Sequence, residues 1–149
     1  MKFIAKILSV FFGVGYIPIA PGTVTSLIVV ILYWLFLSHL SWPIFLLILV
    51  LLFLLGVFVS SVHSSAIKHK DPQSVTIDEA LGQLIPLFLL KPTWGLLLAA
   101  FLLFRFFDIL KPFPVNRAEK FPSGWGIMLD DVVAGLYSGI ILNIYLLIR

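Results

Sequence analysis

Hydrophobic residues gather in long blocks along this chain, and the blocks predict helices. The longest one, 43–62, holds no charged residue. Twenty residues of α-helix extend about 30 Å, which matches the hydrocarbon core of a bilayer, so this block predicts a membrane-spanning helix. The apolar blocks 27–40 and 130–148 predict further spans. The predicted fold class is an all-α, polytopic membrane helical bundle.

The N-terminal block has a different pattern. Lys2, Lys6 and Ser9 recur at helical spacing, and bulky apolar residues fill most positions between them. This pattern is typical of an amphipathic helix that lies in the membrane interface. A signal peptide is the competing interpretation, but the apolar run is short and reaches Gly13 without a convincing small-residue cleavage site.

Segment 13–26 is rich in glycine and proline and predicts a loop. Three hydroxyl side chains near its end, Thr23, Thr25 and Ser26, are candidate caps for the following helix. Backbone N–H groups at Gly22 and Thr23 could receive a phosphate, because the N-terminal end of a helix attracts anions. A plain turn is the alternative.

A polar segment, 60–76, follows the longest apolar block and predicts a loop or short helix in water. His63 and His69 within it are candidate acid-base or phosphate-binding groups, with simple solvation as the alternative. Thr76 and Glu79 then have the spacing of a capping box, which predicts that a helix begins at Ile77.

Residues 80–107 could form one span or a hairpin broken at 91–95. The hairpin places eight of the ten basic residues on one side and leaves Lys91 and Arg149 opposite, whereas a single span removes this bias. The positive-inside rule therefore favours the hairpin, with the basic side cytoplasmic. We expect about four to five membrane helices, with the short hairpin at 77–110.

Arg105, Asp108 and Lys111 are spaced three residues apart, so they share one face of a predicted helix that Pro112 and Pro114 end. Charges in a membrane helix are costly unless they are paired or hydrated, and they often mark a functional site. The alternative is an Arg-Asp pair that only borders the helix end.

The hairpin topology brings distant carboxylates to the same membrane surface. They repel one another unless a cation or protons are bound, and an all-oxygen ligand set favours Mg²⁺, with Mn²⁺ or Ca²⁺ as alternatives. Each acid could instead serve a helix terminus through the helix dipole. The five carboxylates are Asp78, Glu79, Asp108, Asp130 and Asp131.

Composition narrows the possible functions. The chain is 61% hydrophobic and 11% charged, which places it in the membrane class as a single domain over 1–149. It has no cysteine, so thiol-based phosphatases and zinc-thiolate enzymes are excluded. A hard cation beside basic side chains suits the phosphate of an anionic phospholipid, and no nucleic-acid partner is predicted.

Four motifs, in this order, resemble the phosphatidylglycerophosphatase A family over about 13–139. They are Ala20-Pro21-Gly22-Thr23, Asp78-Glu79-x-x-Gly82, Phe104-Arg105-x-Phe107-Asp108-Ile109-x-Lys111-Pro112-x-Pro114, and Gly126-Ile127-Met128-x-Asp130-Asp131-x-x-Ala134-Gly135. The resemblance implies a Mg²⁺-dependent enzyme of the bacterial inner membrane. Such an enzyme removes the terminal phosphate of phosphatidylglycerophosphate at the cytoplasmic side.

The resemblance also implies roles for individual residues. Metal ligands would be Glu79, Asp108, Asp130 and Asp131, with Asp78 as a further catalytic group, and substrate contacts would come from Arg105, Lys111, Gly22 and Thr23. Thr25 departs from the glycine expected at its position. The chain lacks the Pro-Ser-Gly-His element of histidine-dependent lipid phosphatases, because Trp125 follows Gly124.

Other functions stay open at this point. A small divalent-cation transporter or channel subunit would need coordinating groups near the bilayer midplane, whereas the charges here lie at the ends of the spans. A lipid phosphotransferase would need an alcohol acceptor and release no inorganic phosphate. A non-catalytic scaffold is a further alternative, and the oligomeric state is not predicted.

Overall fold

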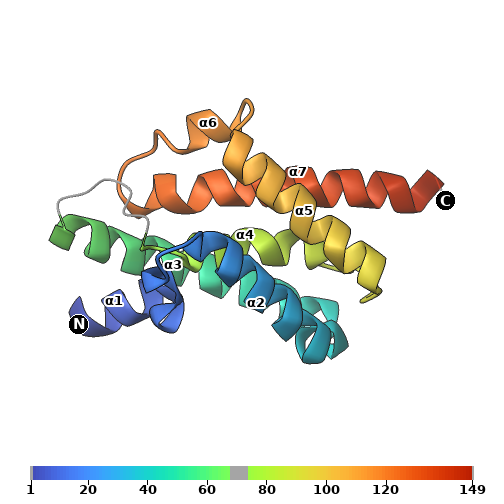
Figure 1. Ribbon diagram of the computed structural model, residues 1–149, viewed down its shortest axis with the longest axis horizontal. Coiled ribbons are helices and arrows are strands. Elements are labelled where there is room, and N and C mark those ends of the chain that lie inside the picture. Colours follow the sequence, from blue (N-terminus) through green and yellow to red (C-terminus); the bar gives the residue numbers. More distant parts are fainter. Residues whose placement is uncertain (1, 68–73, 149) are drawn as a thin grey trace.

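The computed structural model describes residues 2–67 and 74–148, and the regular elements in this part of the chain are all helices (Figure 1). The predicted all-α class is confirmed. His69 and its charged neighbours in 68–73 lie outside the described residues. In chain order the elements are α1 (Lys2–Ser9), the 3₁₀ helix η1 (Phe11–Tyr16), α2 (Pro21–Leu35), the 3₁₀ helix η2 (Leu37–His39), α3 (Trp42–Ile67), α4 (Ile77–Leu87), α5 (Trp94–Leu110), α6 (Val115–Ala118) and α7 (Gly124–Ile148).

The short helix α4 is the centre of the bundle. Nine of its eleven residues are buried. One side of α4 packs with α2 and α5 in an apolar core, and another side packs against α3 in a second core. Figure 1 shows α4 between α3 and α7, which lie along the long axis of the molecule.

Glycines allow α4 and α7 to approach very closely. A Cβ atom on Gly135 would lie 2.5 Å from the Gly82 carbonyl oxygen, and one on Gly82 would lie 2.8 Å from the Asp131 carbonyl oxygen. The small residues between 134 and 139 favour such a close approach of another helix. The contact brings Asp131 beside the first turn of α4.

The hairpin is present, because α4 ends at Leu87 and α5 begins at Trp94. Its first arm is about 16 Å long at 1.5 Å per residue, too short to cross a bilayer alone. Within 2–67 and 74–148, two helices, α3 and α7, are long and apolar enough to cross a membrane, and α2 is a shorter apolar helix. The larger count of four to five membrane helices stays a prediction.

The predicted caps of α2 are wrong. The helix begins at Pro21, well before the expected start at 27, and its N-cap is Ala20 in a left-handed conformation. Proline suits the first helical position because it has no N–H to leave unpaired. Thr25 and Ser26 consequently lie inside the helix, where both are fully buried.

Two other boundaries differ from the predictions. Helix α3 continues to Ile67, through part of the predicted polar loop, and α7 begins at Gly124 instead of 130. Tertiary packing explains both differences, since the Gly124 N–H donates to the Ser61 hydroxyl across the two helices. Asp130 and Asp131 therefore lie in the second turn of α7, not in the first.

Helix α4 begins at Ile77 as predicted, with Thr76 at the N-cap. The reciprocal hydrogen bonds of a capping box do not form, because the Thr76 hydroxyl has no hydrogen-bond partner among the described residues. The Glu79 side chain lines a cavity instead.

Candidate active site

A cavity of about 330 Å³ lies where α2 and α4 begin and α5 ends. Four separate segments supply its walls, as the sequence led us to expect. Its lining includes all five predicted carboxylates and both predicted cations. The lining residues are Pro18, Ala20, Pro21, Gly22, Val75, Asp78, Glu79, Arg105, Asp108, Lys111, Asp130 and Asp131.

Three carboxylates form a tight group within this cavity. Asp78, Glu79 and Asp131 each offer an oxygen atom, and the three atoms lie within 4.8 Å of one another. Asp78 and Asp131 are only 9% and 3% exposed. Glu79 Oε2 and Asp131 Oδ2 are buried with no hydrogen-bond partner among the described residues. Buried oxygens this close repel one another, and an oxygen-rich group of this kind suits a hard divalent cation.

The other two carboxylates are paired with cations. Arg105 Nη1 lies 2.7 Å from Asp108 Oδ2, and Lys111 Nζ lies 2.9 Å from Asp130 Oδ2. The predicted metal set contained Asp108 and Asp130, whereas the structure groups Asp78 with Glu79 and Asp131. The metal itself stays a prediction. The group best placed to hold it contains Asp78 and lacks Asp108 and Asp130.

Lys111 does not lie on the helix face that it was expected to share with Arg105 and Asp108. It follows the last residue of α5 in a left-handed conformation, with φ of 45°. Its ammonium also lies 3.1 Å from Glu119 Oε2. Burial lowers the pKa of Lys111, but hydrogen bonds and charge attraction from Asp130 and Glu119 outweigh burial, so the net pKa is well above the ordinary value.

The start of α2 forms one wall of the cavity. A Cβ atom on Gly22 would lie 2.1 Å from Glu79 Oε1, so glycine is required for the carboxylate to sit against α2. Thr23 is not among the residues that line the cavity. The N-terminal ends of α2 and α4 both lie at the cavity, where their dipoles favour negative charge.

Sequence reasoning missed some of the residues that build this cavity, and one of its candidates, His63, lies elsewhere. The cavity walls at Pro18 and Val75 carry no chemical signal in the sequence, whereas Ala20 belongs to the first of the four motifs. The ion pair between Glu119 and Lys111 could not be predicted either, because it depends on how segment 111–123 folds. His63 is buried in α3 with Nε2 3.5 Å from the Ser74 hydroxyl, and it is not among the residues lining the cavity.

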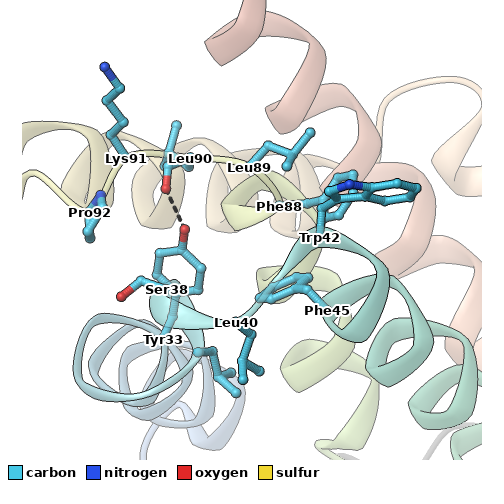
Figure 2. Close-up of a pocket in the computed structure, with 11 residues that line it drawn as sticks. Tyr33, Ser38, Leu40, Trp42, Phe45, Phe88, Leu89, Leu90, Lys91 and Pro92 are labelled. Atoms are coloured by element: carbon cyan, nitrogen blue, oxygen red, sulfur yellow. Dashed lines mark hydrogen bonds between the residues drawn. The ribbon is translucent and has the colours of Figure 1, made fainter.

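A second cavity, of about 230 Å³, lies at the opposite end of α2 and α4 (Figure 2). Its lining is mostly aromatic and aliphatic, and the Tyr33 hydroxyl donates a hydrogen bond to the Leu90 carbonyl across it. Lys91 is the charged residue among its lining residues, and its side chain points away from the Tyr33 ring (Figure 2). This cavity has no carboxylate in its lining.

Comparison with known proteins agrees with the motifs. The sequence model of the phosphatidylglycerophosphatase A family matches residues 7–146. The chain belongs to the phosphatidylglycerophosphatase A family. This is an enzyme family, and the described carboxylate cavity lies within the matched region.

Three relatives extend the comparison. A Haemophilus influenzae protein named Phosphatidylglycerophosphatase A is 44% identical over 137 residues, covering 91% of this chain and 84% of that protein. The Escherichia coli K12 protein of the same name is 37% identical over 138 residues, covering 91% and 80%. A Bacteroides thetaiotaomicron protein, provisionally named as a phosphatidylinositol-3-phosphatase, is 36% identical over 151 residues, covering 96% and 94%. No solved structure gives a significant match.

Proposed function

We propose that this phosphatidylglycerophosphatase A family member is a Mg²⁺-dependent lipid phosphatase. Its substrate would be phosphatidylglycerophosphate, and its products phosphatidylglycerol and inorganic phosphate. The observation that carries the proposal is the group formed by Asp78, Glu79 and Asp131, whose oxygens lie within 4.8 Å in a cavity that Arg105 and Lys111 also line. The names of the Haemophilus and Escherichia relatives support the same substrate.

The three grouped carboxylates would hold the metal. Their donor atoms are all oxygens, and two of these, on Glu79 and Asp131, have no hydrogen-bond partner among the described residues. Both properties fit Mg²⁺, which prefers carboxylate oxygens and phosphate. When bound, the ion would polarise a phosphoryl oxygen of the substrate.

The cations of the cavity would bind the phosphate. Arg105 Nε is buried without a hydrogen-bond partner among the described residues, so a donor is left for a phosphate oxygen. Asp108 and Asp130 hold the Arg105 and Lys111 side chains through ion pairs. Hydrolysis breaks the bond from phosphorus to the glycerol oxygen, which takes up a proton, and water supplies the new oxygen on phosphorus. Developing negative charge on the phosphoryl oxygens would be stabilised by the two cations.

We further propose that the protein is a multi-pass protein of the bacterial inner membrane, with the cavity on the cytoplasmic side. Large apolar side chains cover the outward surface of α3, including Leu47, Leu51, Leu54 and Phe58. Such a surface is suited to lipid rather than to water. The cavity lies at one end of the bundle, where the headgroup of an anionic phospholipid would be located.

The decisive experiment measures phosphate release from phosphatidylglycerophosphate by the purified protein in detergent. We expect release that requires Mg²⁺ and that is lost in Asp131→Asn and strongly reduced in Asp108→Asn. Activity that is indifferent to a chelator, or that is unchanged in both variants, would contradict the metal-carboxylate proposal. A phosphotransferase would release no phosphate, and a transporter would move Mg²⁺ into liposomes without lipid turnover.

A second substrate is favoured by the Bacteroides relative, whose provisional name refers to a phosphatidylinositol 3-phosphate lipid. The same preparation should therefore be assayed with that lipid. A higher kcat/KM for phosphatidylglycerophosphate is expected. Two of the three relatives are named for that substrate, and one of them, the Haemophilus protein, has a higher sequence identity to this chain than the Bacteroides protein has.

A further inference from the structure

Two contacts define how α2 and α4 are aligned. At the active-site end, Gly22 lies against the Glu79 carboxylate. At the opposite end, the Tyr33 hydroxyl donates to the Leu90 carbonyl, just beyond α4 (Figure 2). Both pairs are separated by 57 positions in the sequence. The two helices therefore run in the same direction, and Ser26 and Gln83 both lie between these contacts.

Ser26 follows Gly22 by four residues on α2, and Gln83 follows Glu79 by four residues on α4. Both side chains are fully buried. The Ser26 hydroxyl and both polar atoms of the Gln83 amide have no hydrogen-bond partner among the described residues. Each lies about one helical turn beyond the contact between Gly22 and Glu79, on its own helix.

Helix geometry directs the Gln83 side chain toward the carboxylate. Gln83 follows Glu79 by four residues, so the two side chains share a face of α4. Side chains on a helix lean toward its N-terminus, which directs the Gln83 amide toward the turn that carries Glu79. Glu79 Oε2 is itself buried without a hydrogen-bond partner among the described residues.

Packing does not explain a glutamine at this position. A buried amide without partners lowers folding stability, and an apolar side chain of similar volume would avoid this penalty. Violations of this kind are expected at functional sites. An amide offers both donors and an acceptor, so it can serve a carboxylate and a hydroxyl at the same time.

We propose that Gln83 and Ser26 are positioning residues for Glu79, and that an internal water molecule links the three side chains. The water would have Glu79 Oε2, the Gln83 amide and the Ser26 hydroxyl as partners, a number typical of buried water. It would fix the orientation of Glu79 as a metal ligand, as outer-shell hydrogen bonds do in other metal sites. This inference rests on the proposed function, because it takes Glu79 to be a ligand.

The test measures Mn²⁺ affinity of the purified full chain in detergent by electron paramagnetic resonance, beside thermal unfolding without metal. In Gln83→Met, which keeps side-chain length and volume, we expect the Mn²⁺ Kd to rise about 10- to 100-fold. The unfolding midpoint should stay constant or rise, since a buried unpartnered amide is removed. A purely structural role would lower the midpoint and leave the Kd unchanged.

Ser26→Ala should raise the Kd in the same direction by a smaller factor. The matched control is Ser60→Ala, because Ser60 is likewise fully buried with an unpartnered hydroxyl but belongs to α3, and it does not line the cavity. Its Kd should equal that of the wild type.

Wild-type Kd in both Gln83→Met and Ser26→Ala would overturn the inference and leave the metal site standing, as would an equal rise in Ser60→Ala. A wild-type protein that binds no Mn²⁺ would remove the proposed metal site and the inference with it. If Gln83→Met does not fold, the comparison of Ser26→Ala with Ser60→Ala decides.

Discussion

The two ends of the α2 and α4 pair carry cavities of opposite character. The carboxylate cavity, about 330 Å³, is lined by five carboxylates and two cations, whereas the cavity at the other end, about 230 Å³, is lined mainly by aromatic and aliphatic residues. The two ends also differ in hydrogen bonding. The Tyr33 hydroxyl has a hydrogen-bond partner, whereas Glu79 Oε2 has none among the described residues. One end follows the ordinary rules of stability, and the unfavourable electrostatics are concentrated at the other.

This difference teaches where function lies in a largely apolar bundle. Buried polar atoms in stable proteins normally have hydrogen-bond partners, so a local excess of unpartnered oxygens indicates that a ligand is expected there. Variants at the two ends should therefore affect activity and stability in opposite proportions.

The largest effect is expected for Asp131→Asn. Loss of one carboxylate from the group with Asp78 and Glu79 should lower phosphate release by about 10³-fold, since a metal ion contributes several kcal/mol of charge stabilisation. The unfolding midpoint without metal should rise, because repulsion among buried acids is relieved. Retained activity would contradict this assignment, whatever happens to the midpoint.

A matched pair of cations compares the two ends directly. Arg105→Gln should lower phosphate release by about 10²-fold, as expected when a charged donor to a developing oxyanion is removed. Lys91→Gln, at the other end, should leave it within about twofold, since charges at this distance are screened from the site. Equal losses in the two variants would show that Arg105 acts through overall charge and not through contact with phosphate.

Two glycines test whether the Glu79 position matters. In Gly22→Ala the new Cβ would lie 2.1 Å from Glu79 Oε1, whereas in Gly139→Ala the nearest heavy atom would lie at 3.5 Å. Displacement of a single ligand should reduce phosphate release by about tenfold in Gly22→Ala, in line with the sensitivity of catalysis to small misplacements. Gly139→Ala should be nearly neutral. Similar kinetics for both variants would contradict the importance of this contact.

Lys111 provides a prediction about pH. Because the pKa of Lys111 in the folded protein is raised, its ammonium stays charged below its ordinary pKa of about 10.4, and that charge is lost only as pH rises through the higher folded pKa. Between about pH 6 and 9 it should stay charged, so Lys111→Met should raise KM by about tenfold with the same factor throughout. A factor that falls to one within this range would show that the wild-type lysine loses its charge there.

The smallest effect on activity is expected for Tyr33→Phe. This change removes the hydrogen bond to Leu90 at the apolar end and should lower the free energy of unfolding by about 1 kcal/mol, as for a typical hydrogen bond. Phosphate release should stay within about twofold. Chemical denaturation of the purified protein and the phosphate assay would measure the two quantities separately.

Much of the fold could be predicted from the sequence. Hydropathy blocks identified the principal helices, and the break near Lys91 and Pro92 identified the hairpin, because both signals are local. Helix ends were less predictable. The start of α7 depends on the hydrogen bond between Gly124 and Ser61, which are 63 residues apart, and no local pattern reveals it.

The site was predictable in its members but not in its pairings. Charged residues are conspicuous in so apolar a chain, so Asp78, Glu79, Arg105 and Asp131 were all identified. The partners of Lys111 depend on a left-handed backbone at the end of α5 and on the path of the following segment. Gln83 was not singled out and Ser26 was interpreted as a candidate cap, although a polar residue four positions after Glu79 is a usable signal for a neighbour on the same helix face.

The crossing of α4 and α7 has a consequence for the dimensions of the metal group. Asp78 and Glu79 belong to one helix and Asp131 to the other, and the two backbones touch at Gly82 and Gly135, about one turn further along each helix. A single methyl group at either glycine would act as a spacer and move the two halves of the ligand set apart. The bite of the proposed chelate is thus determined by two hydrogen atoms on glycines that never meet the ion.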